Sequence, residues 1–101
     1  MPRPNAKVEE EHDRMEILRY LHECGFMPIT PRSILLYLDD MRHELSAQKI
    51  EFHLYYLCDR RWVDLGIKKI IGQGDQIQWV RITANGVDEF NRRAMELGEI
   101  R

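Results

Sequence analysis

The chain has 101 residues, of which 44% are hydrophobic and 32% are charged, and its formal net charge at pH 7 is −2. These values are ordinary for a globular protein, and the length suits one domain with a single modest core. The slightly acidic balance argues against a protein that binds any polyanion, although a local basic patch can exist on such a chain. No apolar run approaches the roughly 20 residues of a membrane span and no signal peptide is visible, so we expect a cytoplasmic protein.

The first expected helix covers residues 8–24 and follows a short arm. Residues 1–7 (MPRPNAK) contain two prolines and no apolar period, so we expect a disordered arm followed by a single domain over 8–101. Acidic residues at the start of 8–24 suit the positive end of a helix dipole, and Gly25 suits a left-handed residue that ends the helix. The expected buried face consists of Met15, Leu18, Leu21 and His22, widened by Ile17, Tyr20 and Cys24.

The second expected helix starts at Thr30-Pro31, where a capping residue precedes a proline in the first helical position. Its apolar stripe is formed by Ile34, Leu35, Leu38 and Met41.

Ser46 is a good N-cap for a third helix, within the stretch 46–62 (SAQKIEFHLYYLCDRRW). The spacing predicts a buried face made of Ile50, Leu54, Leu57 and the stem of Arg61, with His53 at the edge of the core. The opposite face carries Gln48, Phe52, Tyr55 and Asp59 and is free to contact a partner.

The period then changes from helical to extended. Residues 63–71 are rich in β-branched side chains, residues 72–75 (GQGD) form a compact turn signal, and residues 76–82 return as a second strand. Thr83 caps a last helix that Gly98 ends. The apolar positions of this helix are Val87, Phe90, Ala94 and Leu97.

The predicted order is helix, helix, helix, strand, strand, helix, which is a mainly α fold with a small β-hairpin (α+β). With the segments ILRYLHECG, TPRSI, HLYYLCDRRWVDL and WVRITANGVDEF, this order resembles the winged helix-turn-helix fold of bacterial transcriptional regulators. That family often passes from the wing into the last helix through an I/L-T-x-x-G step, matched here by residues 82–86 (ITANG). Residues 60–63 (RRWV) occupy the place where the third helix ends and the wing begins.

The resemblance implies a sequence-specific DNA-binding regulator. The N-terminal end of the third helix would enter the major groove, where Gln48 would read a base edge and Phe52 could contact a thymine methyl group. Phosphate contacts would come from Lys49, from Arg60 and from the hairpin, with Arg81 a further basic candidate. The candidate DNA-contacting residues are Ser46, Gln48, Lys49, Phe52, Tyr55, Arg60, Lys68 and Lys69.

A second interpretation is a winged-helix module that binds a protein. Glu51 lies among the candidate DNA contacts, where it can accept a hydrogen bond from cytosine but repels phosphate. Phe52, Tyr55 and Tyr56 could instead form an exposed aromatic patch, a feature more typical of protein interfaces. Lysines on an exposed strand also serve to block edge-to-edge aggregation.

The sequence has no pattern for a metal site or for catalysis. His22 and Cys24 are two residues apart on a helix and point to different sides, and His53 and Cys58 also diverge. There is no phosphate-binding glycine loop before a helix and no Ser/His/Asp set, so we expect neither a cofactor nor an enzyme. The two cysteines lie in helical patterns and are expected to be reduced thiols.

Regulators of this type usually pair to read two half-sites. The terminal helices carry apolar residues beyond one core stripe, namely Ile17, Tyr20, Met95 and Ile100. We therefore expect a symmetric homodimer through these helices.

Overall fold

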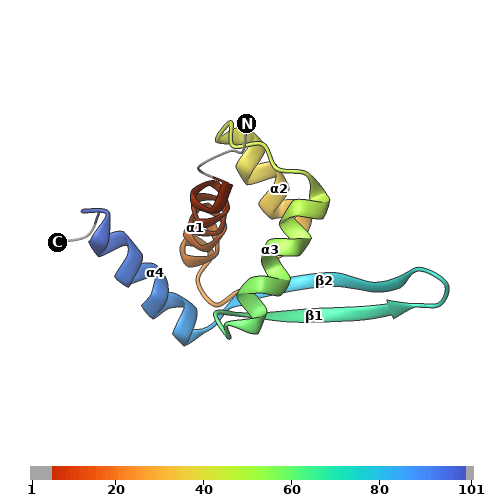
Figure 1. Ribbon diagram of the computed structural model, residues 1–101. Coiled ribbons are helices and arrows are strands. Elements are labelled where there is room, and N and C mark those ends of the chain that lie inside the picture. Colours follow the sequence, from red (N-terminus) through yellow and green to blue (C-terminus); the bar gives the residue numbers. More distant parts are fainter. Residues whose placement is uncertain (1–5, 100–101) are drawn as a thin grey trace.

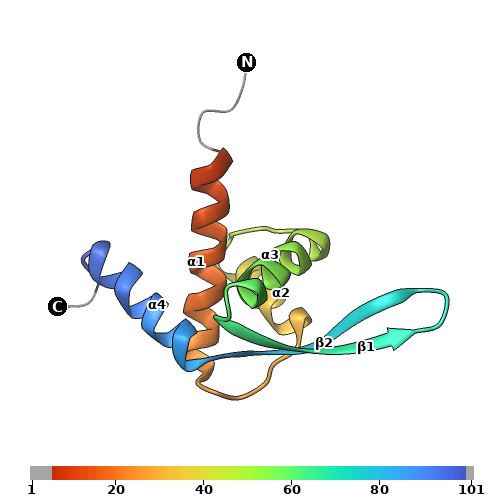
Figure 2. The same ribbon diagram turned by 60° about the horizontal axis from the view of Figure 1, so that its bottom comes forward.

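Four helices and a two-stranded antiparallel hairpin make up residues 6–99, the part of the chain that the computed structural model describes. Their order confirms the expected one: α1 (Ala6–Cys24), α2 (Pro31–Asp40), α3 (Ala47–Asp59), β1 (Val63–Ile70), β2 (Gly74–Ile82) and α4 (Ala84–Glu96). Helices α1, α2 and α3 pack together, α4 lies on the other side of α1, and the hairpin projects away from the helices (Figures 1 and 2).

Side-chain caps begin three of the helices, as their sequences predicted. The hydroxyl oxygen of Thr30 accepts a hydrogen bond from the backbone N–H of Ser33, at 3.2 Å. Ser46 caps α3 and Thr83 caps α4 in the same way, each bonding the third residue of the helix at 3.1 and 3.0 Å. Each cap satisfies a backbone donor that the helix leaves unpaired.

One core joins the first three helices, the base of the hairpin and α4. Its centre contains most of the predicted stripes of the helices and the inward side chains of the strands, and Leu54 is fully buried there. The buried hydrophobic residues are Met15, Ile17, Leu18, Leu21, Ile34, Leu38, Ile50, Leu54, Leu57, Val63, Ile77, Val80, Ile82, Phe90 and Ala94.

The hairpin is longer at its second strand than expected, because β2 begins at Gly74 rather than Gln76. The pairing runs from Val63 opposite Ile82 to Ile70 opposite Gly74, with a bulge that leaves Gln78 unpaired. Residues 71–73 form the turn. The base of the hairpin is tied to the link between α1 and α2 by two backbone hydrogen bonds, in which the Ile29 and Val80 N–H groups donate to the opposite carbonyl at 2.9 and 2.8 Å.

Four of the expected burials are wrong, three of them because the residue lies at or beyond the end of its helix. Arg61 adopts a left-handed conformation with φ 63° after the end of α3, so its stem leaves the buried stripe and is exposed. Met41 and Leu97 are C-cap residues and are 55% and 63% exposed. His53 is fully buried rather than at the edge of the core.

The N-terminal boundary also differs. Ala6 and Lys7, expected in the arm, belong to α1, and the remainder of that arm lies outside the described residues. Ile17 is completely buried within the chain and Tyr20 stacks on Tyr37 with ring centroids 4.4 Å apart, so neither side chain is spare for a dimer contact. Ile100 lies outside the described residues.

Candidate nucleic-acid interface

The outward face of α3 is exposed from its first turn to its last. Gln48 and Lys49 are exposed at the N-terminal end, and Phe52 and Tyr55, 53% and 37% exposed, follow along the helix. Ser46 is exposed, but its hydroxyl is already used by the cap. The predicted reading face is therefore accessible, with two aromatic rings at its centre.

The predicted phosphate-contacting cations are exposed. Lys49, Arg60, Lys68 and Lys69 have no carboxylate partner within residues 6–99. Arg81 differs, because its guanidinium forms an ion pair with Asp64 at 3.3 Å. Four unpaired cations are thus available to an anionic ligand.

These cations do not form one cluster. Lys49 and Arg60 stand near opposite ends of α3, separated by about 16 Å of helix axis. Lys68 and Lys69 are consecutive residues of β1, so their side chains point to opposite faces of the hairpin. A single duplex laid against one face of the hairpin would meet one of these two lysines.

Acidic groups lie between the cations. Glu51 and Asp59 are exposed on α3, and Asp75 is exposed on β2 opposite Lys69. Burial, together with the carboxylates of Glu51 and Asp75, raises the pKa of the Tyr55 phenol. The space between α3 and the hairpin therefore contains both signs of charge.

A polar group lies beneath α3 that the sequence did not reveal. The carboxylate of Asp13 contacts two imidazoles from different elements, His43 Nε2 at 2.6 Å and His53 Nε2 at 3.5 Å. Neither ring nitrogen of His53 has a hydrogen-bond partner. Burial, and the nearby Arg14 charge, lower the pKa of His53, and Asp13 opposes this shift.

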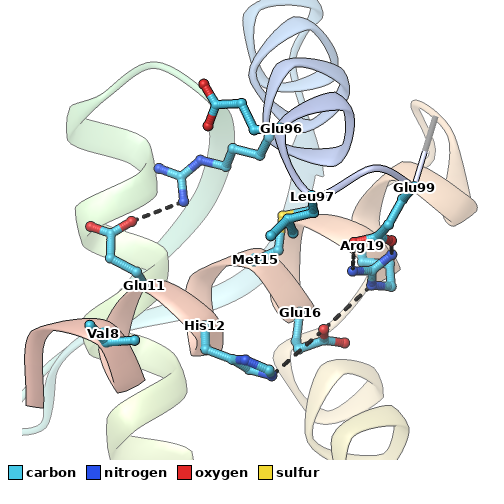
Figure 3. Close-up of a pocket in the computed structure, with 10 residues that line it drawn as sticks. Val8, Glu11, His12, Met15, Glu16, Arg19, Glu96, Leu97 and Glu99 are labelled. Carbon is cyan, nitrogen blue, oxygen red and sulfur yellow. Dashed lines mark hydrogen bonds and ion pairs between the residues drawn. The ribbon is translucent and has the colours of Figure 1, made fainter. Parts of the chain in front are cut away.

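A pocket of about 400 Å³ lies between α1 and α4, on the side of α1 away from α3 (Figure 3). Ion pairs cross it, because Glu11 Oε2 accepts a hydrogen bond from Arg93 Nη1 at 3.0 Å and Glu99 binds Arg19. The lining residues are Val8, Glu11, His12, Met15, Glu16, Arg19, Arg93, Glu96, Leu97 and Glu99.

The surroundings of Arg60 were also missed by sequence reasoning. Its guanidinium carbon lies 5.1 Å from the centre of the Tyr56 ring and 6.0 Å from that of Trp62. The Tyr56 contact had a visible signal, since the two residues are four apart on a helix. The contacts of these aromatic rings with α1 and α4 depend on tertiary packing, so no sequence pattern indicates them.

None of the helices within residues 6–99 is long and apolar enough to cross a bilayer. Over the same span, no three or more His, Cys, Asp or Glu side chains gather so that they could hold a metal ion. Cys24 and Cys58 are free, partly buried thiols.

Comparison with solved structures identifies the fold. The chain matches an X-ray structure described as a PadR-like transcription factor from "bacteroid fragilis", with a TM-score of 0.76 and 14% identity over 94% of this chain and 88% of that one. It also matches a crystal structure from Thermoplasma acidophilum described as a candidate transcriptional regulator, with a TM-score of 0.68 and 17% identity over 91% and 86% of the two chains. No protein-family model matches the sequence, and no curated protein matches it either. At these identities the likeness concerns the fold, and the chain has the winged helix-turn-helix fold of these two proteins.

Proposed function

We propose that the protein is a DNA-binding transcriptional regulator that inserts α3 into the major groove and holds the neighbouring backbone with its β1–β2 wing. The observation that carries the proposal is the helix-turn-helix formed by α2 and α3, next to a projecting wing (Figure 1). Exposed cations without carboxylate partners within residues 6–99 lie on α3, at its C-terminal end and on the wing. The likeness of the chain to structures described as a transcription factor and as a transcriptional regulator supports the same function. In this proposal the protein acts in the cytoplasm.

The roles within the interface follow from position. Gln48, exposed in the first turn of α3, reads a base edge, with the capped N-terminus at Ser46 beside it. Lys49 and Arg60 hold phosphates on the flank of α3, and one lysine of the wing, Lys68 or Lys69, holds the next phosphate. The methyl group of a thymine can pack against Phe52, with Tyr55 beside it.

The wing is tested with the double variant Lys68→Ala/Lys69→Ala. Binding should weaken on every DNA sequence, and the slope of log K against log salt should flatten by roughly one unit, since one phosphate contact is lost. The matched control is Lys7→Ala/Arg92→Ala, which removes the same charge from exposed positions on α1 and α4. Equal loss in the two double variants would reject a role for the wing.

Base readout is tested with Gln48→Ala, using a duplex selected from a random pool by the parent protein. Discrimination should relax at one base position, by roughly 1–3 kcal/mol for a bidentate contact. Unchanged base preference in this variant would remove Gln48 from the reading face.

A second candidate function is a protein-interaction module, and a specific observation favours it. Phe52 and Tyr55 lie exposed beside the carboxylates of Glu51, Asp59 and Asp75. Tyr56, expected in the same patch, is instead partly buried and covered by Arg14. Aromatic residues are enriched at protein interfaces, and acids are unfavourable beside phosphate. For this function, Phe52→Ala or Tyr55→Ala should abolish capture of the partner while the wing lysines matter little, because aromatic anchors carry about 2 kcal/mol or more.

We also propose that the regulator is a symmetric homodimer formed through α1 and α4. The side chains that support this contact are Val8, Met95 and Leu97, which are 64%, 60% and 63% exposed. Val8 and Leu97 line the pocket between the two helices. A second protomer placed there would give the two half-site readers that such regulators need.

A further inference from the structure

Six side chains form a closed ring of contacts around the C-terminal end of α3. The ring, called the Arg60 ring below, joins residues of α1 and α4 to the end of the predicted recognition helix. Its members are Glu11, Arg14, Tyr56, Arg60, Trp62 and Arg93.

Arg60 occupies the exposed edge of the ring. Its guanidinium carbon lies 5.1 Å from the centre of the Tyr56 ring and 6.0 Å from that of Trp62. Cations at such distances from aromatic rings are attracted to them. Arg60 is therefore held by two aromatic residues, one on α3 and one between α3 and β1.

The two aromatic residues are in turn held by buried or half-buried arginines. Arg14, on α1, is 5% exposed, and its guanidinium carbon lies 3.5 Å from the centre of the Tyr56 ring. Arg93, on α4, places its guanidinium carbon 5.2 Å from the centre of the Trp62 ring. The aromatic residues that contact Arg60 are thus positioned from α1 and from α4.

Glu11 closes the ring. Its Oε1 atom lies 3.3 Å from Arg14 Nη1, and its Oε2 atom lies 3.0 Å from Arg93 Nη1. Glu89 adds a second carboxylate to Arg93, at 2.6 Å from Nε. Two of the three arginines therefore have carboxylate partners within the protein.

Arg60 is the arginine of the ring that has no carboxylate partner within residues 6–99. Its side chain is oriented by the aromatic rings, while its charge stays available to an external anion. A free arginine side chain loses rotamer entropy when it binds, whereas an arginine already held in place loses less. This arrangement is what a preformed phosphate contact requires.

We propose that Glu11, Arg14, Tyr56, Trp62 and Arg93 are positioning residues that hold Arg60 for a DNA phosphate. The inference rests on the proposed function, because it assigns Arg60 to the DNA backbone. It also makes the packing of α4 against α1 part of what sets DNA affinity, although α4 lies away from the interface. The phosphate contact itself belongs to Arg60, and the other five residues act through it.

The test measures binding of a fluorescein-labelled random-sequence duplex to the full chain at several salt concentrations, by fluorescence anisotropy. Arg93→Met keeps an apolar stem and removes the guanidinium above Trp62. The expected result is a roughly 2- to 5-fold weaker affinity, the fold-change that corresponds to one exposed cation–π contact. The matched control, Arg92→Met, removes the same charge from the neighbouring residue of α4, whose partners are Glu89 and Glu96, and should bind like the parent.

A double-variant cycle separates positioning from general destabilisation. Arg93→Met should have no effect on DNA affinity in an Arg60→Ala background, because there is no side chain left to position. A fall in affinity that persists in that background overturns the proposal, as does equal binding by Arg93→Met and Arg92→Met. The proposal is also overturned if Arg60→Ala binds DNA as tightly as the parent. In that case, weaker DNA binding by Gln48→Ala and by the wing variant would still support the proposed function.

Trp62 supplies a second test if Arg93→Met lowers the melting temperature strongly. Trp62→Phe keeps an aromatic face and should restore most of the affinity that Trp62→Leu loses. Equal affinity in these two variants, at comparable melting temperatures, would contradict a role for the aromatic face.

Discussion

His53 lies fully buried on α3, and neither of its ring nitrogens has a hydrogen-bond partner. Burial and the charge of Arg14 lower its pKa, while Asp13, 3.5 Å away, opposes the shift. The side chain therefore stays neutral in the folded protein at pH values where an unfolded histidine takes up a proton. Because a proton on His53 is unfavourable while the residue is buried, the packing of α3 depends on pH.

The lowered pKa of His53 makes the stability of the folded protein depend on pH. In the unfolded chain the pKa of His53 is about 6.5, and in the folded protein it is lower. The unfolded state binds the proton first, so the free energy of unfolding should fall as pH falls below about 6.5, by up to about 1.4 kcal/mol per pH unit. His53→Phe, measured by urea unfolding at several pH values, should flatten this dependence.

If His53→Phe and the parent lost stability equally on acidification, His53 would not be the titrating group.

Close backbone approaches in the wing and at the start of α4 give a prediction at the scale of elements. A Cβ atom on Gly66 would lie 2.0 Å from Trp79 Nε1, and one on Gly86 would lie 2.0 Å from the Trp62 carbonyl oxygen. The indole can turn away, whereas the carbonyl is fixed by the hydrogen bond that it accepts from Thr83 at 3.0 Å. Both glycines therefore allow contacts that an alanine would disturb.

Gly66→Ala should cost roughly 1–3 kcal/mol of stability, the usual range for overpacking, and Gly86→Ala should cost more. Thermal unfolding of the two variants shows which one loses more stability. A smaller loss for Gly86→Ala would mean that α4 can shift at its start, and that the Thr83 cap is less rigid than its contacts indicate.

The elements themselves were largely predictable because their signals are local. Thr30, Ser46 and Thr83 each bond a backbone N–H three residues ahead, a relation that is visible in sequence. Arg61 shows the limit of a periodic pattern, because the helix ends at Asp59, two residues before it, and the stripe cannot continue. The bridge between Ile29 and Val80 joins residues far apart in the chain, so no local pattern announces it.

The candidate site was predictable in part. The exposure of Gln48, Lys49 and Phe52 follows from helical spacing, as predicted. The environment of Arg60 depends on Arg14 and Arg93, which come from distant helices, and periodicity says nothing about such contacts.

At the scale of the whole molecule, α4 packs on α1 and leaves Met95 and Leu97 exposed at one end of the chain. Because Ile17 and Tyr20 are used inside the protomer, a dimer must rely on the outer surface of these helices. Sedimentation at tens of micromolar should give a dimer, and Met95→Lys/Leu97→Lys should give a monomer, since two charges would be buried in an apolar contact.

The control is Phe26→Lys/Met27→Lys, which introduces the same two charges at apolar positions, 62% and 69% exposed, in the link between α1 and α2. It should leave the dimer intact. A parent protein that sediments as a 12.1 kDa monomer would contradict the dimer outright.

The salt dependence of DNA binding by the parent protein tests the central claim most directly. With phosphate contacts from Lys49, Arg60 and one wing lysine, log K should fall with log salt at a slope of about −2.7 for each protomer. This slope should appear on random-sequence duplex, because phosphate contacts do not depend on base sequence. A parent protein with no salt-dependent affinity for any DNA pool at low ionic strength would contradict the regulator and favour the protein-interaction module.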